Sequence, residues 1–252
     1  MEKIVFVTPF PDSADAAERM APAGFEFVPA KGGSAEYQSA IADAQYLVGF
    51  VSGLVQTELF NSAPNLKLIQ LLSAGYDDAD PDAARSANVP VSNNGGANSV
   101  AVSEHAVLLM LAVCRQLVRQ HTNVTAGRWR GNQTPRLFEL RGKTVGIVGL
   151  GSIGKKVARL VKAFGTEVIY YDIARLTEDQ EDGLGVRFRL LNELLSTADI
   201  VSLHTPLNAS THHMIGAEQL RLMQSSAFLV NTARGPVVDE KALYDALVSG
   251  EI

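Results

Sequence analysis

Short apolar runs alternate with longer amphipathic stretches through the first hundred residues. Five such runs stand out, at residues 3–7, 25–28, 46–50, 66–72 and 89–92. Strands that alternate with helices are typical of βαβ units, in which the strands lie parallel in one sheet. The pattern predicts an α/β domain.

A cluster of turn-forming residues, "SNNGGANS" at 92–99, interrupts this alternation and predicts a domain boundary. The helical stretch that follows, 99–118, is apolar nearly all round its centre, which predicts burial on most sides, between domains or between subunits. A polar stretch comes next, and a second alternation starts at Lys143. We therefore expect two domains, residues 1–97 and 98–252.

The second alternation predicts five more strands, the first of which, "TVGIV", is followed at once by "GLGSIG". Its three glycines open a helix whose apolar residues are expected on one face: Ile153, Val157, Leu160, Val161 and Phe164. Glycine lets the backbone approach a pyrophosphate, and the N-terminus of a helix offers unpaired N–H groups. Gly149, Gly151 and Gly154 therefore predict a dinucleotide site, although a purely structural glycine turn is the alternative.

Asp172 ends the second strand of this unit, 18 residues after Gly154. A carboxylate there can accept hydrogen bonds from a ribose 2′-hydroxyl and would repel a 2′-phosphate, which favours NAD over NADP. Arg175, three residues further on, could receive a phosphate and leaves some use of NADP open.

Composition excludes several classes of protein. The net charge is −5 and no long basic cluster occurs, which argues against binding to nucleic acid or to an anionic membrane. The longest apolar run, 106–114, is far shorter than the ~20 residues that span a bilayer. The single cysteine, Cys114, excludes an internal disulfide, indicates a cytoplasmic location, and is expected to be buried and unreactive. No metal site is predicted.

Arg234 follows the last predicted strand, on a loop that leaves the carboxyl end of the sheet. Ligands of open parallel sheets bind beyond these ends, and a guanidinium matches a carboxylate with two parallel hydrogen bonds. An anionic substrate held against a nicotinamide is therefore expected. The alternative is a surface arginine that pairs with Asp239 or Glu240.

Four segments stand in a characteristic order and spacing: "NGGANSVAVSEHAVLLMLA", "LRGKTVGIVGLGSIGKKVA", "ADIVSLHTPLNASTHHMI" and "VNTARGPVVDEKALYDAL". Together with "LKLIQLLSAGYDDAD" they resemble the D-isomer-specific 2-hydroxyacid dehydrogenases, which include glyoxylate reductases, D-lactate dehydrogenases and D-3-phosphoglycerate dehydrogenases. The resemblance implies two parallel-sheet domains, flavodoxin-like and Rossmann, with a cleft between them. It also implies NAD as cofactor, hydride transfer to or from a small D-2-hydroxyacid or 2-oxoacid, and a homodimer formed through the cofactor domain.

The same resemblance implies a role for each of several residues. Arg234 would bind the substrate carboxylate and polarise the carbonyl. The substrate would also meet the backbone of Ser73, Ala74 and Gly75, and Asn98. Ser152 and Ile153 would hold the pyrophosphate. The adenosine or the nicotinamide would be lined by His204, Thr205, Pro206, Thr211, Thr232 and Ala233.

The catalytic histidine and glutamate of the family follow a strand and loop that should come after Gly250, and neither is present in these residues. His204 is the best histidine within the chain, although its position in the family lies beside the cofactor. His105 is expected to pack inside, His212 and His213 to lie near the cofactor or in solvent, and His121 has no visible site.

The final helix has Asp239 to cap its start and Gly250 to end it, and such a helix normally returns the chain to the sheet for another strand. We therefore expect a truncated version of a longer enzyme, in which the second domain is incomplete and the chain is inactive by itself. The strand "AFLVN" would then be an exposed edge strand. Two other readings stay open, an NAD-sensing protein like the transcriptional corepressors of this fold, and an inactive NAD-binding remnant.

Overall fold

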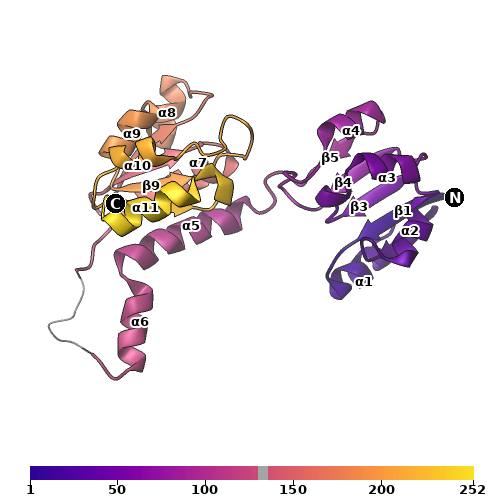
Figure 1. Ribbon diagram of the computed structural model, residues 1–252, viewed down its shortest axis with the longest axis horizontal. Coiled ribbons are helices and arrows are strands. Elements are labelled where there is room, and N and C mark those ends of the chain that lie inside the picture. The colour runs from indigo at the N-terminus through magenta and orange to yellow at the C-terminus, as the bar shows by residue number, and fades with distance from the viewer. Residues whose placement is uncertain (130–135) are drawn as a thin grey trace. The chain divides into compact units, whose positions relative to one another are not determined.

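The computed structural model describes residues 1–129 and 136–252. These residues form two compact units, Met1–Asn98 and Ser99–Ile252, each with its own core (Figure 1). The division lies one residue after the boundary expected from the turn-forming cluster.

The first unit is a sheet of five parallel strands in the order β2-β1-β3-β4-β5. This order is that of flavodoxin-like sheets. All five strands coincide with the predicted apolar runs, so the prediction is confirmed. They are β1 (Glu2–Val7), β2 (Phe25–Ala30), β3 (Tyr46–Gly49), β4 (Leu68–Leu71) and β5 (Val91–Ser92).

Helices cover this first sheet, and its core lies along the central strands. Leu47 and Ile69 are fully buried, because β3 and β4 have neighbours on both sides and helices over their faces. Asp80 caps one of the helices by accepting hydrogen bonds from the N–H groups of Asp82 and Ala83. The helical elements are α1 (Pro11–Arg19), α2 (Ala35–Ile41), η1 (Ser52–Leu54), α3 (Thr57–Ser62) and α4 (Pro81–Ser86).

The second unit is also a sheet of five parallel strands, in the order β10-β9-β6-β7-β8. Its first strand, β6, is central. The chain adds β7 and β8 on one side of β6 and then adds β9 and β10 on the other, so the strand order switches between β6 and β9. Ligands of such sheets bind beyond the carboxyl ends of the strands at that switch. The strands, again at the predicted places, are β6 (Thr144–Val148), β7 (Glu167–Tyr171), β8 (Arg187–Phe188), β9 (Ile200–Leu203) and β10 (Phe228–Asn231).

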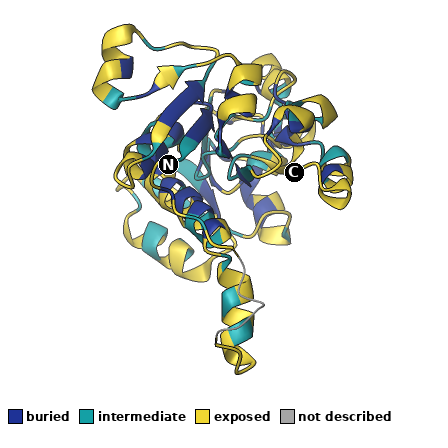
Figure 2. Cartoon of the chain, turned by 90° about the vertical axis from the view of Figure 1, so that its left-hand side faces the viewer, coloured by how far each residue is buried: buried dark blue, intermediate teal, exposed yellow. Residues whose placement is uncertain are grey.

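The second unit begins with two helices, and its other helices follow strands. The buried residues concentrate along the sheet and the helix surfaces that face it (Figure 2). The elements are α5 (Ser99–Cys114), α6 (Leu117–Thr125), α7 (Ser152–Lys162), α8 (Glu178–Leu184), α9 (Leu191–Thr197), α10 (Ala217–Leu222), η2 (Gly235–Val237) and α11 (Glu240–Ser249).

The apolar stretch 99–118 is not one helix, and this part of the prediction is wrong. Gln116 adopts a left-handed conformation, with φ of 46°, which ends α5 and starts α6 at a bend of 61°. Within this chain the stretch is not buried on most sides, since Val100 and Leu108 are more than half exposed, and burial between subunits stays a prediction. Cys114 is buried as predicted, and burial raises the pKa of its thiol.

In the part of the chain that the structure describes, no helix taken alone has the length and apolar character to cross a membrane. The bent pair α5 and α6 meets the criteria of length and composition only when both helices are counted together.

Helix α7 buries a narrower face than its apolar pattern predicts. Val157 and Val161 are fully buried, whereas Leu160 and Phe164 are more than a third exposed. The helix ends at Lys162, so Phe164 stands in the turn after it, where Gly165 takes a φ of 75°. The prediction of one helix face is therefore wrong for Phe164, which lies outside the helix, whereas Leu160 lies on the helix and is partly exposed.

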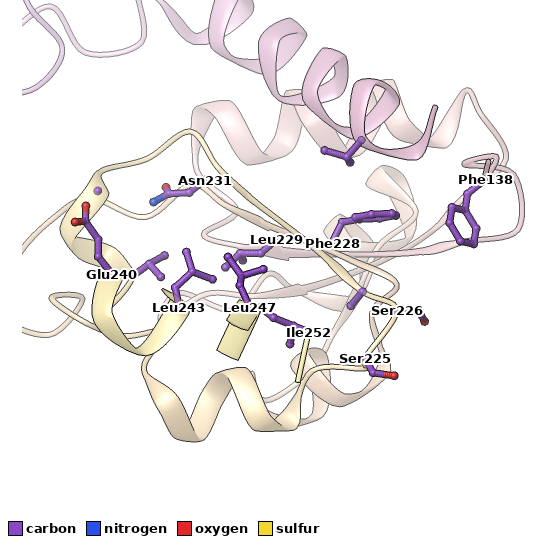
Figure 3. A pocket seen from close by; sticks show the side chains of 14 residues that line it. Phe138, Ser225, Ser226, Phe228, Leu229, Asn231, Glu240, Leu243, Leu247 and Ile252 are labelled. Atoms are coloured by element: carbon purple, nitrogen blue, oxygen red, sulfur yellow. The ribbon is translucent and has the colours of Figure 1, made fainter. Parts of the chain in front are cut away.

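Helix α11 begins and ends where the sequence predicts. Asp239 accepts a hydrogen bond from the N–H of Ala242, and Gly250 ends the helix with a φ of 71°. Among the described residues β10 is an edge strand of the sheet, as expected. A groove of about 610 Å³ runs beside it, where Leu229, Leu243 and Leu247 point into one space (Figure 3).

Candidate functional site

The three glycines after β6 are required for different reasons. Gly149 has a φ of 93°, and a Cβ there would lie 2.8 Å from the carbonyl carbon of His204. A Cβ at Gly154 would overlap the carbonyl oxygen of Gly149. A Cβ at Gly151 would meet no atom within 4 Å. Packing therefore accounts for the first and third glycines, whereas open space at the second leaves room for a ligand to approach the backbone.

The N-terminus of α7 opens at that same space. Gly151 is the N-cap residue and has no side chain that could accept a hydrogen bond from the first turn. The first bond within the helix is donated by the N–H of Lys155 to the carbonyl of Gly151. The N–H groups of the first turn thus point toward an anion that would lie at Gly151, as in phosphate sites at helix N-termini.

Asp172 lies directly beside the glycine turn. Its two carboxylate oxygens accept hydrogen bonds from the N–H of Leu150, at 2.7 Å, and from the N–H of Ala174, at 2.8 Å. The Gly149 N–H in turn donates to the carbonyl of Tyr171, at 2.8 Å. The end of β7 is thereby bonded to the turn, and each carboxylate oxygen keeps a lone pair for a further donor.

His204 connects the end of β9 to the loop after β10. Its Nε2 lies 2.9 Å from the Ser202 hydroxyl and its Nδ1 lies 3.3 Å from the Thr232 hydroxyl. Burial lowers the pKa of His204 to about 4. The ring is therefore neutral at pH 7, and both of its nitrogens already face hydroxyl groups, which favours a positioning role over proton transfer.

Protonation of His204 should destabilise the folded protein below neutral pH. The folded-state pKa lies below the ordinary value of 6.5, so the unfolded chain binds a proton first as pH falls. Stability should be full above pH 6.5 and fall by roughly 3 kcal/mol by pH 4. Denaturant unfolding across this range should show that slope for the wild type and a much weaker one for His204→Gln. Equal slopes would contradict the assignment.

Thr205 and Thr211 occupy the loop that follows His204. Thr205 has a buried hydroxyl oxygen with no hydrogen-bond partner among the described residues. Because a buried hydroxyl normally has a partner, a polar ligand at the glycine turn would account for it. Thr211 is itself buried and donates to the carbonyl of Pro206 at 2.6 Å, so it holds the loop closed.

Arg234 stands on the loop after β10, directly before η2, and its side chain is exposed. Asn231 holds this loop from both sides: its Oδ1 accepts from the Ala233 N–H at 3.0 Å, and its Nδ2 donates to the Arg234 carbonyl at 2.9 Å. The guanidinium donates to the carbonyl of Ala233. Asn231 was not anticipated from the sequence, because an asparagine at a strand end is also an ordinary turn residue.

A chain of contacts links the loop that carries Arg234 to the glycine turn. Gly149 packs against the backbone of His204, the His204 ring faces the Thr232 hydroxyl, and Arg234 lies two residues after Thr232. The proposed cofactor and substrate groups of this unit thus gather at the carboxyl ends of β6, β9 and β10.

In the first unit, the loop after β4 is bonded to the loop after β5. The Ser73 hydroxyl donates to the Gly75 carbonyl, the Asn94 N–H donates to the Ser73 carbonyl, and the Asn93 side chain donates to the Ala74 carbonyl. The expected substrate-facing backbone at 73–75 is therefore held at the carboxyl edge of its sheet. Asn98 is exposed at the end of the unit.

The remaining histidines are placed as follows. His105 is exposed on α5, so the expectation that it packs inside is wrong. His212 and His213 stack with ring centroids 3.9 Å apart, and His213 lies 3.9 Å from Asp239. His121 is exposed on α6.

Comparison with protein families decides the assignment. Residues 107–252, more than half of the chain, match the family described as "D-isomer specific 2-hydroxyacid dehydrogenase, NAD binding domain". The chain belongs to this family. The second unit is accordingly an NAD-binding domain of this family, and NAD is its cofactor.

Individual relatives agree with this family. The chain is 41% identical to a glyoxylate reductase of Korarchaeum cryptofilum over 84% of its own length and 64% of the relative's. It is 38% identical to a D-3-phosphoglycerate dehydrogenase of Methanocaldococcus jannaschii, over 86% of its own length and 41% of the relative's. The crystal structure of an Aquifex aeolicus D-lactate dehydrogenase with NAD and lactic acid superposes with a TM-score of 0.88 at 31% identity, covering 99% of this chain and 74% of that one.

The chain spans less than two thirds of the length of these curated relatives. The open position at Gly151, the uncapped start of α7 and the unpartnered Thr205 hydroxyl all fit the pyrophosphate and ribose of NAD. Bound NAD would supply the hydride-accepting or hydride-donating nicotinamide.

Proposed function

We propose that the protein is an NAD-dependent oxidoreductase that transfers a hydride between nicotinamide and a small D-2-hydroxyacid or 2-oxoacid. The observation that carries this proposal is the position of Arg234, joined through Thr232 and His204 to the glycine turn that receives NAD. A guanidinium there can bind a substrate carboxylate and polarise the adjacent carbonyl. The names of the glyoxylate reductase and D-lactate dehydrogenase relatives support the same substrate class.

The residues of this chain would divide the work between binding and orientation. The first turn of α7 would hold the pyrophosphate and Asp172 the ribose. His204, as a neutral ring, would hold Thr232 and with it the loop that carries Arg234. The backbone at 73–75 is the proposed substrate-binding segment of the first unit.

Activity measured on the full-length gene product tests the proposal. NADH consumption should follow addition of glyoxylate, hydroxypyruvate, pyruvate or phenylpyruvate, with one of these acids clearly preferred. The residues 1–252 should bind NADH by themselves, because they hold the glycine turn and Asp172. A full-length product that binds NADH but reduces none of these acids would favour the NAD-sensing alternative.

We further propose that the protein is a homodimer through its NAD-binding unit. Its helices α5 and α6 carry exposed apolar side chains, of which Leu108 is 53% exposed and Val118 is 79% exposed. Because such residues rarely gather on the surface of a monomer, a second copy is the occupant we expect. Sedimentation should show a dimer for the wild type and a monomer for Leu108→Glu/Val118→Glu. The control Val248→Glu, also exposed but on α11, should remain a dimer.

A further inference from the structure

Glu181 is a buried carboxylate that the cofactor site described above does not use. It lies on α8, is 4% exposed, and is the one charged side chain that is fully buried among the described residues. Burying a carboxylate is unfavourable unless it is paired and hydrogen-bonded, so its partners indicate what it is for. Its sequence context, "EDQEDG", is that of a solvated helix and gives no sign of burial.

Two groups bind the Glu181 carboxylate. The Tyr170 hydroxyl donates to Oε1 at 2.9 Å, and the Arg175 Nε lies 3.4 Å from the same oxygen. The Tyr170 hydroxyl also accepts from the N–H of Leu176, at 2.9 Å. Glu181 is thus the anchor of the segment 172–176, which begins at the ribose-binding carboxylate.

Arg175 is held on the opposite side of β7 from Asp172. Its guanidinium lies over the Phe188 ring, 4.9 Å from the centroid, on the β8 side of the sheet. The Asp172 carboxylate accepts from the N–H of Leu150, which follows β6, and from the N–H of Ala174. Since β7 lies between β6 and β8, the Phe188 ring under Arg175 and the glycine turn beside Asp172 lie on opposite sides of that strand.

We propose that Glu181 is a positioning residue for cofactor choice: by holding Arg175 against Phe188, it keeps the guanidinium away from the place where a 2′-phosphate would lie. The preference for NAD then has two sources. Asp172 repels a 2′-phosphate, and Glu181 holds away the Arg175 guanidinium that could bind this phosphate. This inference rests on the NAD site proposed above. A glutamine at 181 keeps the acceptor for Tyr170 but loses the charge that attracts Arg175.

Binding of NADH and NADPH, measured by fluorescence titration, tests the inference. Glu181→Gln should tighten NADPH binding by roughly tenfold with little change for NADH, which is the scale of one hydrogen bond to a charged group. The matched control is Glu178→Gln, the same change at an exposed position of the same helix, and it should leave both affinities unchanged.

Two further variants keep the test decisive. Glu181→Gln/Arg175→Ala should lose the gain for NADPH, because the released guanidinium is what receives the phosphate. Phe188→Leu, which removes the ring under Arg175 and leaves Glu181 in place, should give a smaller gain if Glu181→Gln does not fold. An unchanged ratio of NADH to NADPH affinity in both Glu181→Gln and Phe188→Leu, or a gain that survives Arg175→Ala, would overturn the inference. Absence of NADH binding by the wild type would instead refute the NAD site itself.

Discussion

Replacement of Arg234 by alanine should reduce kcat/KM of the full-length gene product by about 10³-fold, while the affinity for NADH changes little. The guanidinium is the cation at the carboxyl end of β10, and removing a group that stabilises transition-state charge typically costs about 10²–10³ in rate. The loss should appear in both kcat and KM, because the same group binds the carboxylate and polarises the carbonyl. Steady-state kinetics with the preferred 2-oxoacid measure both.

The controls for this variant separate charge from geometry. Arg234→Lys should recover only part of the activity, since an ammonium cannot form two parallel hydrogen bonds with a carboxylate. Arg221→Ala removes an exposed arginine of α10 that lies 3.5 Å from Glu251, far along the chain from the glycine turn, and should leave turnover intact. Full activity of Arg234→Ala would refute the proposed role.

The second large effect is expected from valine at Gly151. No protein atom lies within 4 Å of the added Cβ, and the φ of −74° suits any residue, so the loss of stability should be limited to that of a poorer N-cap residue. The side chain would fill the space through which a pyrophosphate reaches the first turn of α7. Loss of two or more backbone hydrogen bonds to a charged group should weaken NADH binding on the order of 100-fold.

The neighbouring glycine provides the contrast. Gly154→Val would drive its Cβ into the carbonyl oxygen of Gly149 and should lower the free energy of unfolding as well as the affinity. Calorimetric titration with NADH and denaturant unfolding, both on the chain 1–252, distinguish the two variants. If Gly151→Val binds NADH as the wild type does, the ligand does not occupy this turn.

Patterns in the sequence predict the local parts of this structure well. All ten strands of the two sheets lie where apolar runs alternate with helices, because burial on both faces of a parallel sheet requires such runs. The glycine turn and the cap at Asp239 are equally local, since each depends on one residue type at one backbone position.

The features that could not be predicted from the sequence depend on contacts between residues that are distant in the chain. The left-handed Gln116 splits a continuous apolar stretch, and no residue in it signals a helix end. Leu160 and Phe164 match the helical period but meet no partner that would bury them. Glu181 and Asn231 owe their roles to hydrogen bonds that exist only once the sheet has formed. The backbone of the candidate site can therefore be predicted from the sequence, whereas the side chains that orient it are harder to predict.

The uncovered margin of β10 has a practical consequence for handling the chain 1–252. Backbone N–H and C=O groups along that edge can pair with the same strand of a neighbouring molecule, and the leucines beside it provide a hydrophobic surface for the contact. At high concentration this chain should slowly aggregate and precipitate, although each molecule stays folded. Shelf life would then be governed by surface chemistry at the sheet margin and not by melting temperature.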